Sequence, residues 1–366
     1  MFTEDDVKEL AGFISPDPIL SVYLNTEPVR GNADIYKLRL RNMLKHIHLP
    51  HDVAEVERYL NTEYDWSGRG LIIFSCKPQN FFRTFTVEVP VPTFSHVGNR
   101  PSIKPMTSLL YNFGGYGVAL VDKQGARLFS FHLGELREQE GMLGETVKRM
   151  KSGGGSSAGP GRRGGASGID RLMTEQAERN MKEVASFATK FFEDNKVRRI
   201  LIGGTEDNLA AFRSMLPKSW QSLIIGTFPM QMSATASEVL EKVMHVSEEA
   251  EKSNQLNIVE NLITAAAKGG LATIGIKDTI KAANDHRVQT LILEEEFHQP
   301  GFLCNSCNGI LSLDAQCEMC HGQAQPVEDV VDLLISEVLR TGGEVEVLKP
   351  NPPLNAAQHI GAILRF

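Results

Sequence analysis

Residues 269–297 read GGLATIGIKDTIKAANDHRVQTLILEEEF, and they indicate the fold class of the chain. Two glycines form a turn, ATI suits a short strand, IKDTIKAAN has helical spacing, and VQTLILE is a longer apolar run. A strand, a helix and another strand in succession are typical of an α/β layer. Residues 327–348 then repeat a helix, ended by Gly342 and Gly343, and a strand. We therefore expect residues 239–366 to form an α/β/α sandwich.

The first part of the chain mixes the same two kinds of pattern. PILSVYLNT (18–26) and GLIIFSC (70–76) are apolar, β-rich runs that suit buried strands. Between them, IYKLRLRNMLKHI (35–47) places apolar residues at helical spacing, with Lys and Arg on the other side. Strands interleaved with helices favour a mixed α/β domain over residues 1–105.

The middle of the chain begins with a hairpin pattern over 116–136. A strongly amphipathic helix is predicted over 169–195, and two buried strands are predicted over 197–204 and 222–228. The sequence therefore predicts an α/β protein of three mixed domains, with these boundaries: 1–105, 106–238 and 239–366.

The composition limits the classes of function. Of 366 residues, 42% are apolar and 23% are charged, which is ordinary for a globular protein, and the formal net charge is −7. Because a small acidic excess gives no bulk affinity for nucleic acid, any contact with phosphate must come from local basic segments. We find no run of about 18 apolar residues and no apolar core near the N-terminus. We therefore expect no membrane span, no signal peptide and a cytoplasmic location.

Four cysteines near residue 310 have the spacing of a metal site. The segment CNSCNGILSLDAQCEMC (304–320) is CxxC-x9-CxxC, and clustered CxxC pairs in a cytosolic chain suggest metal rather than disulfides. Four thiolates complete the tetrahedral shell of Zn²⁺ and leave no open position, so such a site is structural. We predict a small zinc-ribbon-like insert over 302–322 with four zinc ligands: Cys304, Cys307, Cys317 and Cys320.

Two alternatives to this ligand set stay open. The CxxC pairs could be redox-active or vestigial, although neither opens a helix after a core strand as a thioredoxin-like motif does. His321 follows Cys320 directly and could replace it as a ligand. The fifth cysteine, Cys76, lies in an apolar run and is expected to be a buried small hydrophobe.

A glycine-rich tract interrupts the middle domain. Residues 152–168 read SGGGSSAGPGRRGGASG, in which eight of seventeen residues are Gly. The GxGxxG match over 159–164 lacks the preceding strand of a dinucleotide site, and no P-loop GK[ST] follows. No acidic residue lies between Glu145 and Asp170, whereas that span holds five cations: Lys148, Arg149, Lys151, Arg162 and Arg163. Composition alone fits a solvated linker and a flexible phosphate-binding arm equally well.

The order of these parts resembles that of the archaeal–eukaryotic class-1 release factors and their relative Pelota. A hairpin leads to a basic Gly-rich loop and then to a helix that begins near RLMTEQAERN. The next unit carries GLATIGIKDTIKAANDHRVQTLILEE, a Cys insert, DLLISEVLRTGGEVEVL and IGAILRF. This resemblance covers roughly residues 106–366. The N-terminal motifs PILSVYLNTEP and RGLIIFS look like the bacterial, Balon-like branch of that superfamily.

The resemblance implies a role for the loop. In those release factors a Gly-Gly-Gln loop tip enters the ribosomal peptidyl-transferase centre, where the Gln helps to place water at the peptidyl-tRNA ester. Gly164 and Gly165 match the two glycines, and Ala166 stands where the Gln would be. Since Ala has no amide to orient water, the expectation leans away from an enzyme. A codon-independent peptidyl-tRNA hydrolase is the alternative, because a backbone amide and the ribosome also contribute in that family.

The resemblance also implies partners. Residues 1–105 contain no Asn-Ile-Lys-Ser tetrapeptide, so stop-codon decoding is not expected. The C-terminal domain resembles the one that contacts a translational GTPase or ribosomal stalk proteins. We thus expect a factor that binds the ribosomal A site, in hibernation or stalled-ribosome recognition, with the five cations against rRNA or P-site tRNA. The third hypothesis is a zinc-stabilised cytosolic scaffold whose loop is a linker.

Two further clusters have weaker interpretations. LEEEF (293–297) could bind metal but has no His or Asp at ligand spacing, which favours a solvated strand end. His46, His48 and His51 lie close in sequence, but Pro50 interrupts the helix between them, which disfavours facing ligands.

Overall fold

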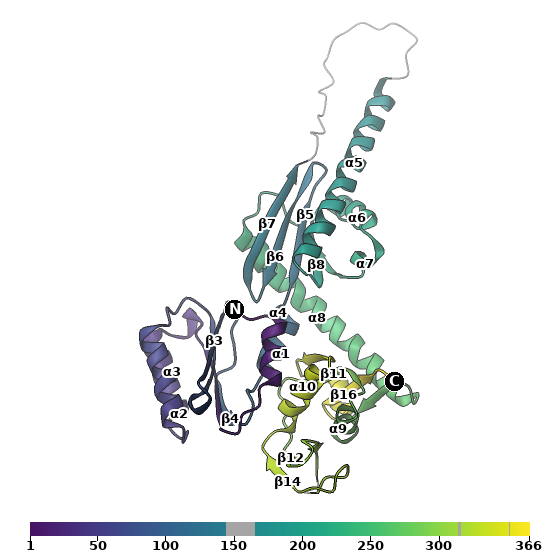
Figure 1. Cartoon of the computed structure of the whole chain (residues 1–366). Coiled ribbons are helices and arrows are strands. Elements are labelled where there is room, and N and C mark those ends of the chain that lie inside the picture. The colour runs from purple at the N-terminus through teal and green to yellow at the C-terminus, as the bar shows by residue number, and fades with distance from the viewer. Residues whose placement is uncertain (144–164, 314–315, 351) are drawn as a thin grey trace, which may run out of the picture. The chain divides into compact units, whose positions relative to one another are not determined.

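The computed structural model describes residues 1–143, 165–313, 316–350 and 352–366, with the side chains of 138, 165–174 and 251 left out. The chain divides into two compact units: the first comprises Met1–Phe113 and Ser253–Phe366, and the second comprises Gly114–Lys252. The described residues form four sheets with flanking helices, which is the mixed α/β architecture that the sequence predicts (Figure 1). No helix within these ranges is long and apolar enough to cross a membrane.

The N-terminal part of the first unit forms an antiparallel sheet in the order β3-β2-β1-β4. Its elements are α1 Glu4–Gly12, β1 Ile19–Asn25, η1 Pro28–Arg30, α2 Ala33–Leu44, α3 Pro50–Thr62, β2 Gly70–Cys76, η2 Lys77–Gln79, β3 Phe81–Val87, β4 Phe94–Gly98 and α4 Lys104–Phe113. Leu20, Val22 and Leu24 alternate along β1 and pack against α2 and α3. The two strands and the helix predicted for this region are thus confirmed.

The C-terminal part of the first unit forms a second sheet in the order β10-β16-β11-β15. Its elements are the last part of α8 Ala236–Ala267, β10 Ala272–Ile274, α9 Ile276–Asn284, β11 Val288–Glu294, α10 Val330–Arg340, β15 Glu344–Leu348, α11 Pro352–Ala356 and β16 Ile360–Leu364. Because β11 and β15 are parallel, the chain returns through a crossover that includes α10. Ile292 and Leu348 pack against Val259 and Leu262 of α8, whereas α9 and α10 cover the opposite face (Figure 1). Helices on both faces make the predicted α/β/α sandwich.

The second unit holds a five-stranded sheet in the order β7-β6-β5-β8-β9. Its elements are β5 Tyr116–Val121, β6 Gly125–His132, β7 Glu135–Leu143, α5 Gly165–Asp194, β8 Arg199–Gly204, α6 Glu206–Met215, α7 Lys218–Gln221, β9 Ile224–Phe228 and the first part of α8. The first three strands form an antiparallel meander, which includes the predicted hairpin, and β5, β8 and β9 are parallel. Phe192 of α5 and Phe212 of α6 pack on one face, and Val239 and Val243 of α8 pack on the other (Figure 1).

Helix α5 begins earlier than the sequence predicts. The apolar stripe places the start at residue 169, whereas the helix runs from Gly165 to Asp194. Farther along α5, Met181 and Val184 of the predicted stripe are buried.

A chain of polar contacts joins the two sheets of the first unit. The Tyr23 hydroxyl donates to the carbonyl of Ser102 at 2.6 Å, and the Ser102 hydroxyl donates to Asp332 Oδ2 at 2.7 Å. Close by, Lys104 Nζ donates to the carbonyl of Phe297 at 2.6 Å. The second carboxylate oxygen of Asp332 is buried and has no hydrogen-bond partner among the described residues. Burial raises the pKa of this carboxyl above its ordinary value.

The pH dependence of stability tests the buried Asp332 carboxyl. Its folded pKa lies above the unfolded value of about 3.9, so the unfolded state binds fewer protons between these two pKa values. The free energy of unfolding therefore falls as pH rises through that window. Asp332→Asn cannot ionise, so we expect the variant to gain stability relative to the wild type from pH 4 toward neutral, by about 1.4 kcal/mol per unit of pKa shift.

Urea unfolding of both proteins between pH 4 and 7 measures this difference. Asp278→Asn, the same substitution at an exposed position on α9, is the control for the loss of a carboxyl as such. A variant-to-wild-type difference that stays constant over this pH range would contradict the raised pKa of Asp332.

Candidate metal centre and basic loop

The structure brings the four predicted cysteines together. Their Sγ atoms all lie within 4.8 Å of one another, with Cys304 and Cys320 at 3.4 Å and Cys307 and Cys317 at 3.5 Å. A tetrahedral Zn²⁺ with Zn–S distances of about 2.3 Å holds its ligands about 3.8 Å apart, so small side-chain shifts suffice to bind it. Two of the four cysteines are buried and two are exposed. The cluster can therefore hold a metal ion in a closed, four-coordinate shell.

Two matching turns present the thiols. The segments 304–309 (CNSCNG) and 317–322 (CEMCHG) both follow the pattern CxxCxG. In each turn the residue after the second Cys is left-handed, with φ of 57° at Asn308 and at His321, and its N–H donates to the carbonyl of the first Cys. A Cβ on the glycine that follows would lie 3.3 Å from Cys307 Sγ at Gly309 and 3.2 Å from Cys320 Sγ at Gly322, so these glycines allow the backbone to lie close to the thiols. The repeated glycine is therefore part of the site, and it is a signal that the spacing of the cysteines alone does not contain.

Backbone N–H groups favour a thiolate within this cluster. The N–H groups of Cys307 and Ser306 point at the sulfur of Cys304 and lower its pKa to about 6. At Cys307 the N–H of Gly309 acts in the same direction, but burial and the neighbouring thiols raise the pKa to about 12. A thiolate is the form that binds metal, and metal binding displaces the protons that remain on the other thiols. The electrostatics of the cluster therefore suit a dication.

One side chain fastens the cysteine insert to the C-terminal sheet. The insert is a three-stranded sheet in the order β13-β12-β14, formed by β12 Gly301–Cys304, β13 Ile310–Leu311 and β14 Ala324–Val327. Asn284, at the end of α9, donates to the carbonyl of Ile310 at 2.8 Å and accepts from its N–H at 3.0 Å. A metal ion in the cluster would join two turns of a segment that has little apolar core of its own.

The described residues contain no other group of three metal-ligating side chains with this geometry. The other positions considered from the sequence are therefore not assembled into a metal site: His46, His48, His51, His321 and 293–297. Within the acidic run, Glu294 is buried and lies 2.7 Å from His359 Nδ1. The prediction of a solvated strand end is wrong for Glu294, because the segment that leads into β16 packs over it.

The glycine-rich tract lies mostly outside the described residues. This applies to Lys148, Arg149, Lys151, Arg162, Arg163 and Gly164. Gly165 and Ala166 belong to the first turn of α5. Since β7 ends at Leu143, residues 144–164 connect the edge strand of the middle sheet to the helix that packs on it.

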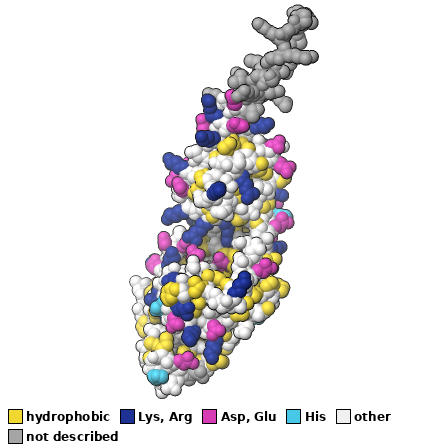
Figure 2. Space-filling model, turned by 90° about the vertical axis from the view of Figure 1, so that its right-hand side faces the viewer, with side chains coloured by type: hydrophobic (Ala, Val, Ile, Leu, Met, Phe, Trp, Pro, Cys, Tyr) yellow, Lys and Arg dark blue, Asp and Glu magenta, His cyan; other side chains and the backbone are white. Residues whose placement is uncertain are grey.

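The charge on the described surface is mixed. Figure 2 shows Lys and Arg side chains interspersed with Asp and Glu side chains over the face that it draws. That face therefore offers phosphate groups no continuous basic field. The five cations between Glu145 and Asp170 are, by contrast, a run of one sign in a chain whose net charge is −7.

The middle of the chain matches a known protein family. Residues 101–248 match the family described as bacterial archaeo-eukaryotic release factor family 10. This range includes the second unit as far as residue 248, with the glycine-rich tract and α5.

Two archaeal relatives are similar over most of the chain. The peptide chain release factor subunit 1 of Methanocaldococcus jannaschii is 24% identical over 320 residues, which are 77% of this chain and 74% of the relative. The same factor from Archaeoglobus fulgidus is 24% identical over 326 residues, 81% of this chain and 77% of the relative. Among solved structures, Archaeoglobus fulgidus Pelota is 13% identical, covers 100% of this chain and 92% of its own, and has a TM-score of 0.34. Residues 101–248 are thus similar to a bacterial family of archaeo-eukaryotic release factors, and most of the chain is similar to archaeal peptide chain release factors.

Proposed function

We propose that this protein is a ribosome-associated translation factor that binds the A site without reading a stop codon. The observation that carries this proposal is the similarity to two peptide chain release factors over about three quarters of the chain, with the family match centred on the unit that holds the basic tract. In this proposal the tract extends toward the peptidyl-transferase centre, and its Arg and Lys side chains bind rRNA phosphates. Hibernation or recognition of stalled ribosomes is the process that such binding would serve.

The three domains expected from the sequence have separate roles in this proposal. Residues 106–238 carry the tract, and residues 239–366 contact a translational GTPase. The cysteine cluster binds Zn²⁺ structurally, because its four thiols fill a tetrahedral shell and leave no position for substrate. In this proposal the tip is Gly164 together with Gly165 and Ala166, which form the first turn of α5, and Ala166 lacks the amide of the release-factor Gln.

Ribosome binding should depend on Arg162 and Arg163. Purified ribosomes carrying labelled peptidyl-tRNA are mixed with the full chain and pelleted over a range of salt concentrations. When the logarithm of the binding constant is plotted against the logarithm of the salt concentration, each lost phosphate contact makes the slope shallower by about 1. Arg162→Ala/Arg163→Ala should therefore reduce the slope by about 1 to 2 and weaken binding. The control Arg179→Ala/Arg213→Ala removes two exposed cations from α5 and α6 of the same unit and should bind like the wild type. Equal binding by both double variants would contradict the phosphate role.

Peptide release should separate binding from hydrolysis. The wild type is expected to bind without release, because the methyl group of Ala166 cannot orient water. Ala166→Gln should gain release in the same assay, with binding retained. Release by the wild type would instead support the peptidyl-tRNA hydrolase, and an Ala166→Gln variant that binds but releases no peptide would contradict the placement of the tip.

Zinc content tests the cysteine cluster. We expect about one zinc per chain by elemental analysis, and a loss of most of it in Cys317→Ser, since three thiols leave the tetrahedral shell open. Cys76→Ser is the matched control, because Cys76 is also buried but lies in β2, away from the cluster. A protein that contains no zinc when purified without chelators, and takes up none when zinc is added, would overturn this assignment.

A further inference from the structure

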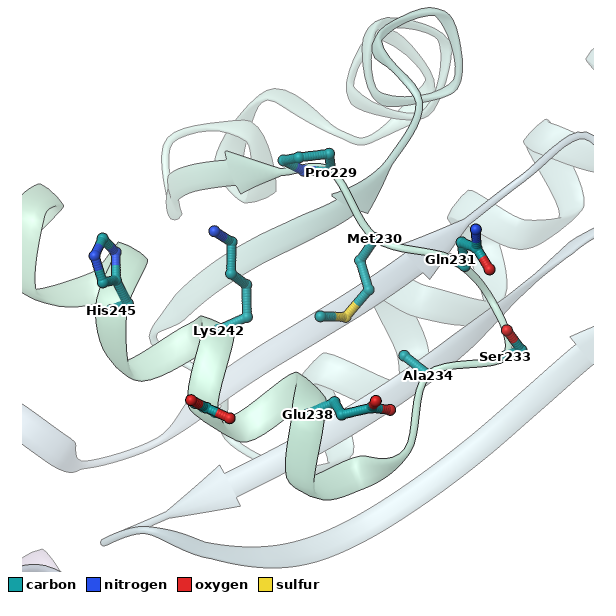
Figure 3. A pocket seen from close by; sticks show the side chains of 9 residues that line it. Pro229, Met230, Gln231, Ser233, Ala234, Glu238, Lys242 and His245 are labelled. Carbon is teal, nitrogen blue, oxygen red and sulfur yellow. The ribbon is translucent and has the colours of Figure 1, made fainter.

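The second unit contains a pocket that the loop and the zinc cluster do not use. It has a volume of about 680 Å³ and lies where the segment after β9 meets the first turns of α8 (Figure 3). It is lined by five residues of that segment and four of the helix: Pro229, Met230, Gln231, Ser233, Ala234, Glu238, Glu241, Lys242 and His245. This volume is within the range of small-molecule and cofactor sites, but the pocket is an open one, since six of its nine lining residues are exposed.

The walls of the pocket are fixed by contacts behind them. The Arg127 guanidinium donates to the carbonyls of Met232 and Ala234, both at 2.6 Å, and lies over the Phe129 ring at 5.0 Å. The N–H of Ala234 in turn donates to the carbonyl of Gln231 at 3.2 Å. Because the segment is held in this way, a ligand would bind with little cost of ordering the protein.

The two ends of the pocket differ in charge. Lys242 and His245 lie about one turn apart on α8, and Figure 3 shows both side chains extending from the same side of the helix. Neither makes an ion pair among the described residues. Glu238 points the other way, toward Ser233 (Figure 3), and its carboxylate accepts from the N–H and hydroxyl of Thr235 at 2.7 and 2.9 Å. The end of the pocket with Lys242 and His245 therefore offers hydrogen-bond donors that can carry positive charge, and the end with Glu238 offers a carboxylate acceptor.

We propose that this pocket binds a nucleoside monophosphate, either free or as an unpaired nucleotide of an RNA chain. Lys242 and His245 bind the phosphate through charge-assisted hydrogen bonds. Met230 and Pro229 form the apolar surface for the face of the base, and a Met sulfur packs well against aromatic rings.

The remaining groups of the pocket match the rest of this ligand. The amide of Gln231 both donates and accepts, so it can read a base edge. Glu241 accepts hydrogen bonds from ribose hydroxyls, as an acidic residue does in other nucleotide sites. Because Glu238 and Glu241 also lie on the wall, added phosphates would meet negative charge, so a monophosphate should bind better than a triphosphate.

Calorimetric titration of the full chain tests this proposal without ribosomes, so its outcome is independent of the proposed translation function. The probes are AMP, GMP, CMP and UMP, the corresponding triphosphates, and a short unstructured RNA. We expect at least one monophosphate or the RNA to bind with one-to-one stoichiometry and a dissociation constant below about 1 mM. Binding of free monophosphate would identify a free nucleotide as the ligand, and binding of the RNA alone would identify a nucleotide within a chain.

Two variants localise the site. Lys242→Glu should weaken binding at least tenfold, and Met230→Ala should weaken it less, since only the base contact is lost. The matched control is Lys252→Glu, which makes the same change of charge on the exposed part of α8. Circular dichroism of each variant verifies folding.

Three results would overturn the proposal. The first is no binding of any monophosphate or of the RNA at millimolar concentration. The second is equal weakening by Lys242→Glu and Lys252→Glu, which would indicate attraction to net charge only. The third is binding of a monophosphate that Lys242→Glu does not weaken, which would place the nucleotide outside this pocket.

Discussion

The parallel pairing of β5 with β8 is the constraint on which the middle unit depends. The two strands pair in register from Tyr116 and Arg199 to Val121 and Gly204. A tight turn cannot join parallel strands, because the chain must return along the whole sheet before the second strand begins. Here the return runs through β6, β7, residues 144–164 and α5. The glycine-rich tract therefore lies in the connection between β5 and β8 that their parallel pairing requires.

Close packing of α5 on the sheet fixes where this crossover ends. A Cβ on Gly117 of β5 would come within 2.7 Å of the side chains of Phe192 and Val197, so the glycine allows this region to lie directly on the strand. Helix α5 has 30 residues and is thus about 45 Å long at 1.5 Å per residue. Met181 is the first residue of the predicted stripe that the structure describes as buried, and Ala166 lies about 22 Å before it along the axis. In Figure 1, α5 extends beyond the sheet toward its glycine-rich start.

Local sequence patterns predicted the helices and strands, but they could not predict contacts between segments that are far apart in the chain. GLIIFSC is buried at every position and was recognisable as a strand, and the CxxC spacing identified four thiols that the fold brings together. Nothing near Glu294 in the sequence shows that His359 lies over it, because 65 residues separate the two. The pocket depends in the same way on Arg127, which holds carbonyls more than 100 residues away. The sequence could predict residues whose role follows from their neighbours in the chain, but not those whose role follows from the packing of the sheet.

The distribution of charge has a consequence for recognition of RNA. The chain has a net charge of −7, and the span between Glu145 and Asp170 carries five cations and no acid, so the rest of the chain carries −12. At physiological salt the screening length is about 8 Å, so a polyanion senses mainly the charges nearest to it. An RNA molecule that approaches most parts of the protein would meet an acidic or mixed surface and would not bind. An RNA molecule that approaches the tract would meet only cations. If the tract binds rRNA as proposed, the acidic charge of the rest of the chain would therefore suppress non-specific binding to nucleic acid and leave the tract as the main point of contact.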